Sequence, residues 1–448
     1  GDSANKNEAG DTTTGSIISG SGSASIFSNN MNIGLNDTTV GSVSGTIDFS
    51  DATGGTFQGV DNLFMAFGSD ATADIDLGGN VDTSLGTVGN RANVRLADNN
   101  GQGGATDFTL TQTGSDFSIH ADQLLIARNR SGTGSADAVL NLTGVASGSI
   151  NVTGGSTRIA EGRDATVNLV IPDAVDLNLG QVGARTDFRI AEGEGSSGTW
   201  TATTGSLTKS AGSADIYHTN FFVGRNNTNE GSVTGTLTLD GTASGIISNE
   251  QTNPSVEIGR YKDATGTVTL GGDMSIEWGN DAQRGNHYVG VNNNANSTLT
   301  EGTLDKSASG AGTVNWFPSV LEVGTNTGAG TGAVVGTIDL SGAAAGSELS
   351  FRTNDLIIGR GHNATGTVTL GSDVDFNYAG NRSIYVGDNA TGTSDTSGIL
   401  TIDGTMNASG SNNLGSIFVA HNNSNSGGAT VNTIGLFDMT GADASSSL

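Results

Sequence analysis

Residues 256–276 read Val256-Glu-Ile-Gly-Arg-Tyr-Lys-Asp-Ala-Thr-Gly-Thr-Val-Thr-Leu-Gly-Gly-Asp-Met-Ser-Ile276 and hold one copy of the pattern that decides the fold. Two alternating apolar residues, Val256 and Ile258, lead into a small residue, Gly259, which we call the anchor. A polar turn, a Thr-rich alternating segment and a looser third alternating segment follow. Because a spacing of two places side chains on one face of a strand, each copy predicts three short strands with one buried face.

The anchor recurs at regular intervals along the chain. Its thirteen positions are Gly34, Ala66, Ala97, Ala127, Ala160, Ala191, Gly224, Gly259, Gly290, Gly324, Gly359, Gly387 and Ala420. Neighbouring anchors lie 28 to 35 residues apart, with a mean of about 32, and a period in this range is typical of solenoids. The sequence therefore predicts an all-β, parallel β-solenoid of about 13 coils, with three short strands and about 32 residues per coil. Right-handed winding is the default for parallel crossovers.

The residue two positions after the anchor predicts the length of the next turn. Eight coils have Asn there and four have Gly, while Tyr261 is the exception. In coils with Gly or Tyr the second strand's first inward residue follows nine positions after the anchor, and in the Asn coils 11 to 14 positions after it. Asn and Gly tolerate positive φ, and stacked Asn amides can hydrogen-bond along a column.

Composition limits the classes of function. The chain has 448 residues, no Cys and a net charge of −27, so thiolate metal sites are absent and nucleic acid is not expected as a partner. No apolar run reaches the ~20 residues of a membrane-spanning helix, so no membrane insertion is expected. We expect a flexible polar segment over 1–15, a single solenoid over 16–440 and a polar tail over 441–448.

Two fragments carry a resemblance to a known group of proteins. Ala264-Thr-Gly-Thr-Val-Thr-Leu-Gly-Gly and Asn363-Ala-Thr-Gly-Thr-Val-Thr-Leu-Gly alternate with Val-Gly or Ile-Gly anchors. They resemble the repeats of bacterial autotransporter passengers, within the wider group of β-helical adhesins and surface fibres. The resemblance implies secretion to the cell surface or beyond, a right-handed β-helix, and a role in adhesion or matrix building. It carries over no active site.

The regular spacing of threonines predicts a column of outward-facing Thr side chains. Thr-x-Thr rows on a flat solenoid face resemble those of ice-binding β-helices, although Thr is also favoured on exposed strands for stability alone. Asp305 and Asp339 interrupt the second row. We therefore expect a candidate surface for glycan or ice at Thr199, Thr201, Thr236, Thr238, Thr267, Thr269, Thr303, Thr337, Thr367 and Thr369.

Charged residues suggest one candidate cation site and several exposed charges. Asp74 and Asp76 flank the inward Ile75, and Asp107 is expected one coil above them, so the trio could hold calcium or form a solvated acidic face. Calcium-binding nonapeptide and EF-hand motifs are absent, and no other cofactor is expected. Charges that directly follow anchors, such as Arg128, are expected to be screened surface groups.

No catalytic constellation emerges from the sequence. The five histidines are far apart, and no cluster of acidic and basic residues marks one groove. Together with the resemblance, which implies secretion and adhesion, this leads us to expect a non-enzymatic extracellular or cell-surface structural protein, a surface fibre or adhesin segment. It would stack end to end with itself or with neighbouring solenoid segments, and could contact glycans or cell surfaces. The alternative is a ligand-binding solenoid that uses the Thr column.

Overall fold

The computed structural model describes residues 12–37, 41–100, 103–130, 133–194, 200–228, 230–249, 254–294, 297–328, 331–351, 355–379, 383–389, 394–407, 416–422, 432–443 and 446. The chain divides into two compact units, Gly1–His218 and Thr219–Leu448. We call them the N-terminal and C-terminal units. Residues 12–15, expected to be flexible, form part of strand β1, which pairs with β3.

Each unit is a parallel β-solenoid, as predicted. The whole chain makes about 12 turns of roughly 31 residues, which agrees with the thirteen anchors because thirteen anchors delimit twelve intervals. The described residues contain only strands, turns and bends. Accordingly, no helix in this part of the chain has the length and apolar character needed to cross a membrane.

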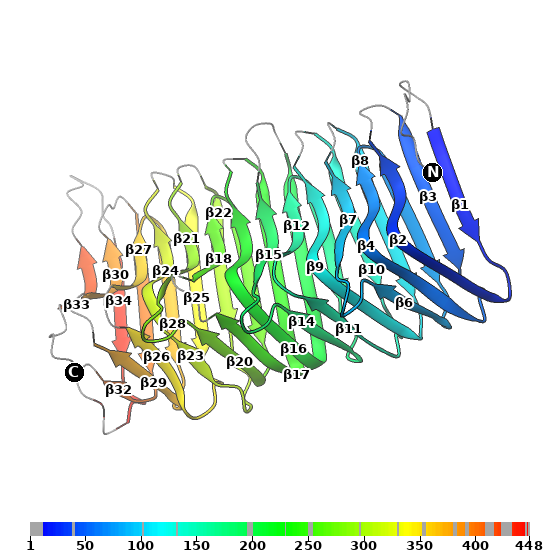
Figure 1. Cartoon of the computed structure of the whole chain (residues 1–448). Helices are drawn as coiled ribbons and strands as arrows, with labels where there is room; N and C mark the ends of the chain where they lie inside the picture. Colours follow the sequence, from blue (N-terminus) through cyan, green and yellow to red (C-terminus); the bar gives the residue numbers. More distant parts are fainter. Residues whose placement is uncertain are drawn as a thin grey trace. The chain divides into compact units, whose positions relative to one another are not determined.

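In the N-terminal unit three parallel sheets run side by side (Figure 1). The first sheet, which ends at the anchors, contains β2 (Ser23–Asn36), β4 (Gly54–Gly68), β7 (Ala92–Asn99), β9 (Asp116–Asn129), β12 (Ser156–Gly162) and β15 (Thr186–Gly193). The second contains β1 (Thr12–Ile18), β3 (Ser42–Phe49), β5 (Ala71–Leu77), β8 (Ala105–Gln112), β10 (Ser135–Asn141), β13 (Ala165–Val170) and β16 (Ala202–Asn226). The third contains β6 (Val81–Leu85), β11 (Ser147–Val152) and β14 (Val175–Leu179), paired with other parts of β4, β9 and β16.

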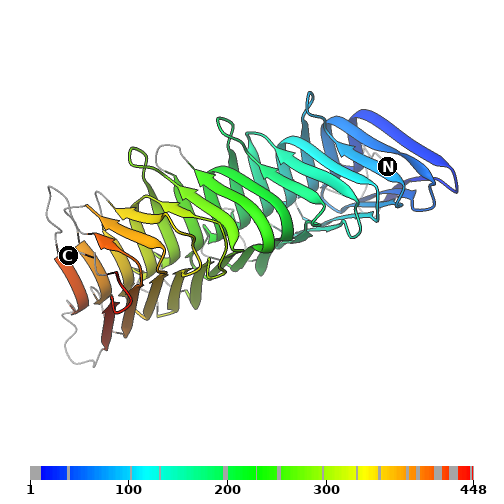
Figure 2. The ribbon, with the colours of Figure 1, turned by 90° about the horizontal axis from the view of Figure 1, so that it is seen from below.

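The C-terminal unit repeats the three sheets. The first contains the end of β16 with β18 (Ser255–Tyr261), β21 (Gly285–Asn292), β24 (Pro318–Asn326), β27 (Leu356–Gly361), β30 (Ser383–Asn389) and β33 (Ser416–Asn422). The second contains β17 (Ser232–Asn249), β19 (Ala264–Leu270), β22 (Leu299–Asp305), β25 (Ala333–Leu340), β28 (Ala364–Leu370), β31 (Thr396–Ile402) and β34 (Thr433–Asp438). The third contains the end of β17 with β20 (Asp273–Trp278), β23 (Val314–Trp316), β26 (Ser347–Phe351), β29 (Val374–Tyr378) and β32 (Met406–Asn407). Figure 2 shows the stacking within each unit from a second direction.

Every anchor adopts the left-handed backbone conformation. Their φ values range from 51° at Ala127 to 71° at Gly387, a region that favours Gly and costs other residues about 1–2 kcal/mol. In the C-terminal unit a Cβ on Gly259 would lie 2.8 Å from Cα of Gly302, on the second strand of a neighbouring coil. The anchor and the Gly of the Thr-Gly-Thr segment are therefore small because two backbones touch there.

Most of the Asn residues two positions after the anchors cap the longer turns, whereas Nδ2 of Asn292 has no hydrogen-bond partner among the described residues. Asn129 Nδ2 donates to the carbonyl of Gly134 at 2.7 Å, and Asn389 Nδ2 donates to that of Ser394 at 3.2 Å. Both Asn side chains are fully buried. The predicted column of amides hydrogen-bonded to one another is thus replaced by amides that bind turn carbonyls. This explains why the Asn coils have longer turns, because a longer turn leaves carbonyls that need a donor.

The inward ladders form the core, with local shifts from the predicted register. The predicted inward positions Phe108, Trp200 and Ile434 do not align with their neighbours; the paired residues are Leu110, Leu207 and Phe437. Insertions in the preceding turns cause these shifts.

Lys306 follows the inward Leu304 and interrupts the apolar alternation, yet it is fully buried at a corner of the coil. There its Nζ donates to the carbonyl of Gly272 at 2.9 Å.

Candidate functional site

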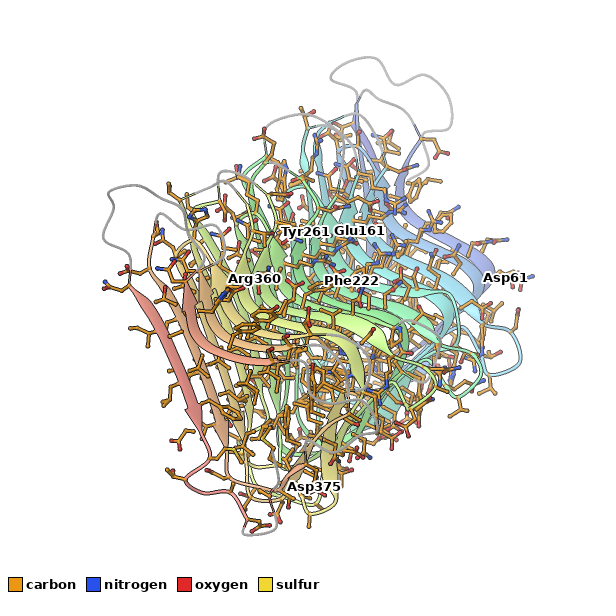
Figure 3. All side chains as sticks on the ribbon, turned by 90° about the vertical axis from the view of Figure 1, so that its left-hand side faces the viewer. Asp61, Glu161, Phe222, Tyr261, Arg360 and Asp375 are labelled. Atoms are coloured by element: carbon orange, nitrogen blue, oxygen red, sulfur yellow. The ribbon has the colours of Figure 1, made fainter. Side chains whose placement is uncertain are left out.

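The candidate site lies on the outer side of the first sheet, where the anchors bend the strands. The side chains two residues before and one residue after each anchor point to this side, and we call the surface they form the corner face. The left-handed anchor folds each strand so that these outward side chains are covered. In the C-terminal unit, Phe222, Tyr261 and Arg360 lie on the same side of the ribbon, while Asp375 of β29 lies at the opposite extreme (Figure 3).

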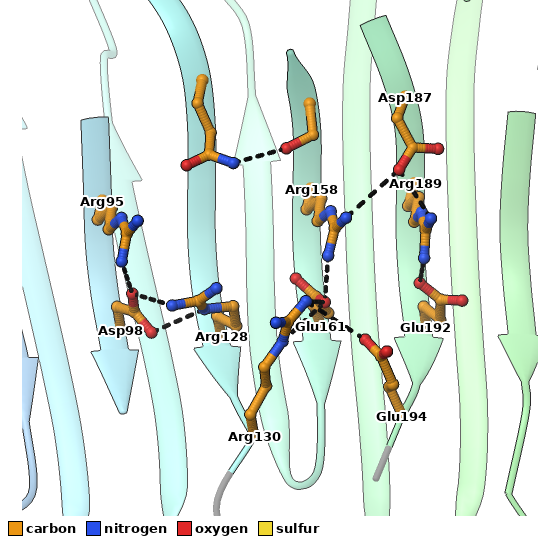
Figure 4. Close-up of polar contacts among 12 residues, drawn as sticks. Arg95, Asp98, Arg128, Arg130, Arg158, Glu161, Asp187, Arg189, Glu192 and Glu194 are labelled. Atoms are coloured by element: carbon orange, nitrogen blue, oxygen red, sulfur yellow. Dashed lines mark hydrogen bonds and ion pairs between the residues drawn. The ribbon is translucent and has the colours of Figure 1, made fainter. Parts of the chain in front are cut away.

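In the N-terminal unit the corner face is a network of buried ion pairs (Figure 4). Asp98, 1 % exposed, accepts from Arg128 Nε at 2.8 Å and from its Nη2 at 2.6 Å. Arg128 is on the next coil, and Arg95 reaches the same carboxylate from the same strand at 3.3 Å. The guanidinium fork therefore joins two coils by a bidentate contact.

The network continues around Glu161, which is also 1 % exposed. Arg130 of the preceding coil approaches it at 2.6 Å, and Arg158 pairs with it from the same strand. Arg158 also lies 3.4 Å from Asp187 on the next coil. Opposite charges thus follow one another along each strand, and each buried charge has an opposite neighbour, although Glu161 stands in register with Glu192 and Arg158 with Arg189.

Three carboxylates of this network, Glu161, Glu192 and Glu194, have oxygens within 4.8 Å of one another. Burial alone would raise the pKa of Glu161, but the hydrogen bond with Glu194 and the charges of Arg158 and Arg130 outweigh burial and lower it. The same hydrogen bond, followed by burial, raises the pKa of Glu194. This arrangement favours a proton shared between Glu161 and Glu194. Nearby arginines already neutralise the carboxylates, which disfavours a metal ion there.

In the C-terminal unit the corner face combines arginines with aromatic rings. Glu257, 3 % exposed, pairs with Arg225 at 2.7 Å and with Arg260. The Arg260 guanidinium lies 4.5 Å from the ring centre of Tyr261 and 3.7 Å from that of Tyr288. These contacts hold Arg260 between two rings, a geometry in which a cation is attracted to the faces of the aromatic systems.

Further along the same face, Asp388 joins three successive coils. It is 2 % exposed and lies 3.2 Å from Arg360 Nε and 2.8 Å from His421 Nδ1. Tyr385 and Phe418 stack beside them, with ring centres 5.0 Å apart and planes at 8°. The carboxylate orients both basic side chains, so that this segment is also held together by contacts between coils.

These contacts correct the prediction for the charges that follow anchors. The residues concerned were expected to be screened surface groups, but most are covered and their charges are paired on the corner face: Arg128, Glu161, Glu192, Arg225, Arg260 and Arg360. The sequence signal was the opposite charge three residues earlier on the same strand, as in Arg158 with Glu161 and Glu257 with Arg260. It could not be interpreted because the burial of an outward position depends on the bend at the anchor.

The predicted threonine column is assembled over five coils of the C-terminal unit. Directly paired residues are Thr236, Thr267, Thr303, Thr337 and Thr367. A second row contains Thr238, Thr269, Asp305, Asp339 and Thr369, followed by Thr401. Thr201 is not part of either row, because it lies in a turn where its amide donates to Asp164. Thr199 lies outside the described residues.

The predicted aspartate trio is not aligned. Asp74 pairs in register with Thr109, and Asp107 pairs with Thr72 and with Asp137. Asp107 is thus displaced by two positions from Asp74, and the three carboxylates do not form one column. Burial, followed by repulsion from Asp48 and Asp74, raises the pKa of Asp76, which is the behaviour of an unneutralised acidic surface.

Comparison with known proteins gives no relative: no family model, no curated protein and no solved structure matches this chain.

Proposed function

We propose that this chain is a non-enzymatic, extracellular structural protein, a β-solenoid segment of a surface fibre or adhesin. The observation that supports this most is the state of the charged residues on the corner face. Buried carboxylates such as Asp98, Glu257 and Asp388 are each shared between arginine or histidine side chains of adjacent coils. Groups that are fully paired in the ground state stabilise the stacking of coils and are poorly placed to exchange protons with a substrate.

The parallel stacking of coils also supports assembly with further solenoid segments. In a parallel solenoid each coil pairs with the next through a complete row of backbone hydrogen bonds, and another copy can extend that row. Electron microscopy of the purified chain over a concentration series, with and without calcium, tests this proposal. Uniform filaments that lengthen with concentration support it. Particles of constant size at all concentrations argue against self-assembly.

The absence of enzymatic activity has its own test. The purified chain is incubated with acidic and with neutral polysaccharides, and the release of reducing ends is measured. We expect no release above that of a heat-denatured sample. Reproducible release that is lost in an Asp388→Asn variant would show that the paired carboxylates of the corner face perform chemistry.

A second candidate function is ligand binding by the threonine rows. The specific observation in its favour is that five threonines stack in register in β17, β19, β22, β25 and β28, which creates a flat, repeating array of hydroxyl and methyl groups. Ice or a glycan chain are the ligands for which such an array is suited. Ice-recrystallisation inhibition and binding to immobilised glycans measure the two cases.

The variant Thr236→Lys with Thr267→Lys should abolish either activity while the unit stays folded. Thr109→Lys with Thr111→Lys on β8 of the N-terminal unit is the matched control, because these threonines are also half-buried and outward. Equal activity of both double variants would argue against a role for the threonine rows.

A further inference from the structure

A small cavity opens beside the corner face of the C-terminal unit. It lies between the beginnings of β18, β21 and β24, and its volume is about 240 Å³. Drug-sized ligands usually occupy sites of ~300–1,000 Å³, so this cavity suits something smaller, of the size of one sugar ring. Its polar and aromatic lining includes Ser255, Arg260, Arg284, Asn286, Tyr288 and Ser319.

The charged groups that line the cavity are both arginines. Glu257 neutralises Arg260 and Asp281 contacts Arg284 at 2.9 Å, yet neither carboxylate lines the cavity. Nε of Arg260 is buried and has no hydrogen-bond partner among the described residues. In a protein with a net charge of −27, a cavity lined by guanidinium groups without an acid is suited to a carboxylate.

Both arginines are held in place before any ligand arrives. Arg260 lies between the rings of Tyr261 and Tyr288. Arg284 donates through Nη1 to the carbonyl of Ser350 at 2.5 Å and lies 5.4 Å from the ring centre of Phe317. Side chains that are already fixed lose little conformational entropy on binding, which favours affinity.

The remaining lining residues select a sugar rather than a bare anion. The half-exposed Tyr288 provides an aromatic surface beside the arginines. Burial raises the pKa of its phenol, which therefore stays neutral. The exposed Asn286 offers hydrogen bonds around the same space, and the Ser255 hydroxyl, which donates to Glu257 at 3.1 Å, can still accept one. An apolar ring face with polar groups around it is the chemistry that a pyranose presents.

We propose that this cavity binds a carboxylated sugar, a uronic acid residue, with the carboxylate toward Arg260 and Arg284 and the ring against Tyr288. The site is separate from the threonine rows of the second sheet. It does not depend on the proposed structural role, so either can fail while the other stands.

To test this, the intact chain is titrated with glucuronic acid, glucose and acetate, each up to about 50 mM. Binding is measured by ligand-observed NMR and by calorimetry. We expect glucuronic acid to bind saturably, with an affinity that falls as salt is added. The affinities of acetate and of glucose should each be at least about tenfold lower. No saturation by glucuronic acid would overturn the proposal. Acetate that binds as well as glucuronic acid would also overturn it, because the site would then recognise only an anion.

Two variants with the same charge change locate the site. Asn286→Asp places a carboxylate at the exposed rim of the cavity. It should lower the affinity for glucuronic acid about tenfold, because like charges repel. Asn293→Asp adds the same charge at an exposed turn position after β21, outside the cavity, and should leave the affinity unchanged. Equal affinities of the two variants would place the binding elsewhere and contradict the proposal. Circular dichroism confirms that both remain folded.

Discussion

His287 is a titratable residue on an inward ladder whose other described members in the C-terminal unit are apolar. It is fully buried, with ring centres 6.0 Å from Trp278 and 5.6 Å from Trp316. Trp316 Nε1 donates to its Nδ1, while its Nε2 has no hydrogen-bond partner among the described residues. Burial lowers the pKa of His287 from 6.5 to about 3. The imidazole is therefore neutral in the folded state over most of the acidic range.

This burial predicts a pH dependence of stability. Between about pH 6.5 and about pH 3 the unfolded chain binds a proton at His287 that the folded chain does not bind. The free energy of unfolding should therefore fall as the pH drops through this window, with a slope of up to ~1.4 kcal/mol per pH unit. His287→Gln can still accept from Trp316 and does not titrate. Denaturant unfolding at several pH values should give a flatter profile for this variant, and identical slopes would contradict the assignment.

Glu194 predicts a pH dependence of opposite sign. Since the hydrogen bond with Glu161 and burial raise its pKa above 4.5, its contribution to stability is present below that value and is lost as the pH rises through the folded pKa. Glu194→Gln keeps a hydrogen-bond donor at all pH values. The difference in melting temperature, native chain minus variant, should decrease as the pH rises from about 4 to about 8. Glu230→Gln, an exposed turn residue of the other unit, is the control.

Individual side chains were the least predictable part of the molecule. Lys306 interrupts an apolar alternation, and only the fold shows that carbonyls at a corner of the coil accept its ammonium protons. The sequence also did not predict the proximity of the Glu161 and Glu194 carboxylates, because Glu194 lies beyond the repeating positions of the strand. The threonine column was predictable because its members share one position in an unbroken repeat.

At the scale of single strands, the anchors predict unequal responses to small substitutions. Gly259→Ala would place a Cβ 1.7 Å from the carbonyl oxygen of Glu301 at a φ of 60°, and should reduce the free energy of unfolding by more than ~2 kcal/mol. Ala127→Gly relieves the cost of the left-handed conformation and removes only one methyl group, so its effect should be within ~1 kcal/mol. Chemical denaturation of both variants measures the difference. Equal losses would contradict the role of backbone contact.

The ion pair between β7 and β9 predicts the effect of leaving a charge buried. Arg128→Met leaves the Asp98 carboxylate with Arg95 alone and should cost about 3–5 kcal/mol. Replacing both partners, as in Asp98→Leu with Arg128→Met, should recover most of this loss. Arg130→Met is the comparison: the Arg130 side chain is 44 % exposed and Glu161 keeps its contact with Arg158, so this removal should cost less than that of Arg128. A double variant as unstable as Arg128→Met would contradict the prediction.

Strand identity was predictable from the sequence, but strand register was only partly so. Most coils with short turns followed the predicted spacing, as Ile75 and Val268 do in their ladders, and Trp200 is an exception because Leu207 takes its place. Where a turn is longer, several apolar residues compete for the first inward position, and Phe108 was chosen in place of Leu110. Hydrophobic alternation fixes which face is buried, and a shift by two residues preserves that face. The error therefore left the predicted fold intact while it displaced Asp107 from Asp74.

At the scale of the molecule, the excess of acidic groups predicts a response to salt. The chain carries 45 acidic and 18 basic side chains. Several of the arginines are already paired with buried carboxylates. Uncompensated pairs remain in direct register on the outside, such as Asp48 with Asp76 and Asp305 with Asp339. The melting temperature should therefore rise between about 10 mM and about 500 mM NaCl, since salt screens exposed repulsion more than buried pairs. Asp76→Asn should reduce this rise, and a fall with salt would contradict the prediction.

The repeated left-handed anchor also determines how such a chain can change over evolutionary time. Loss or duplication of a whole coil keeps every ladder aligned and alters the height by about 4.8 Å. A single inserted residue within a strand turns the following inward side chains outward. Length is therefore inherited in discrete steps, and turns are the places where sequence can drift without a penalty. A lineage can lengthen or shorten this protein by unequal recombination between repeats, without the need to evolve a new core.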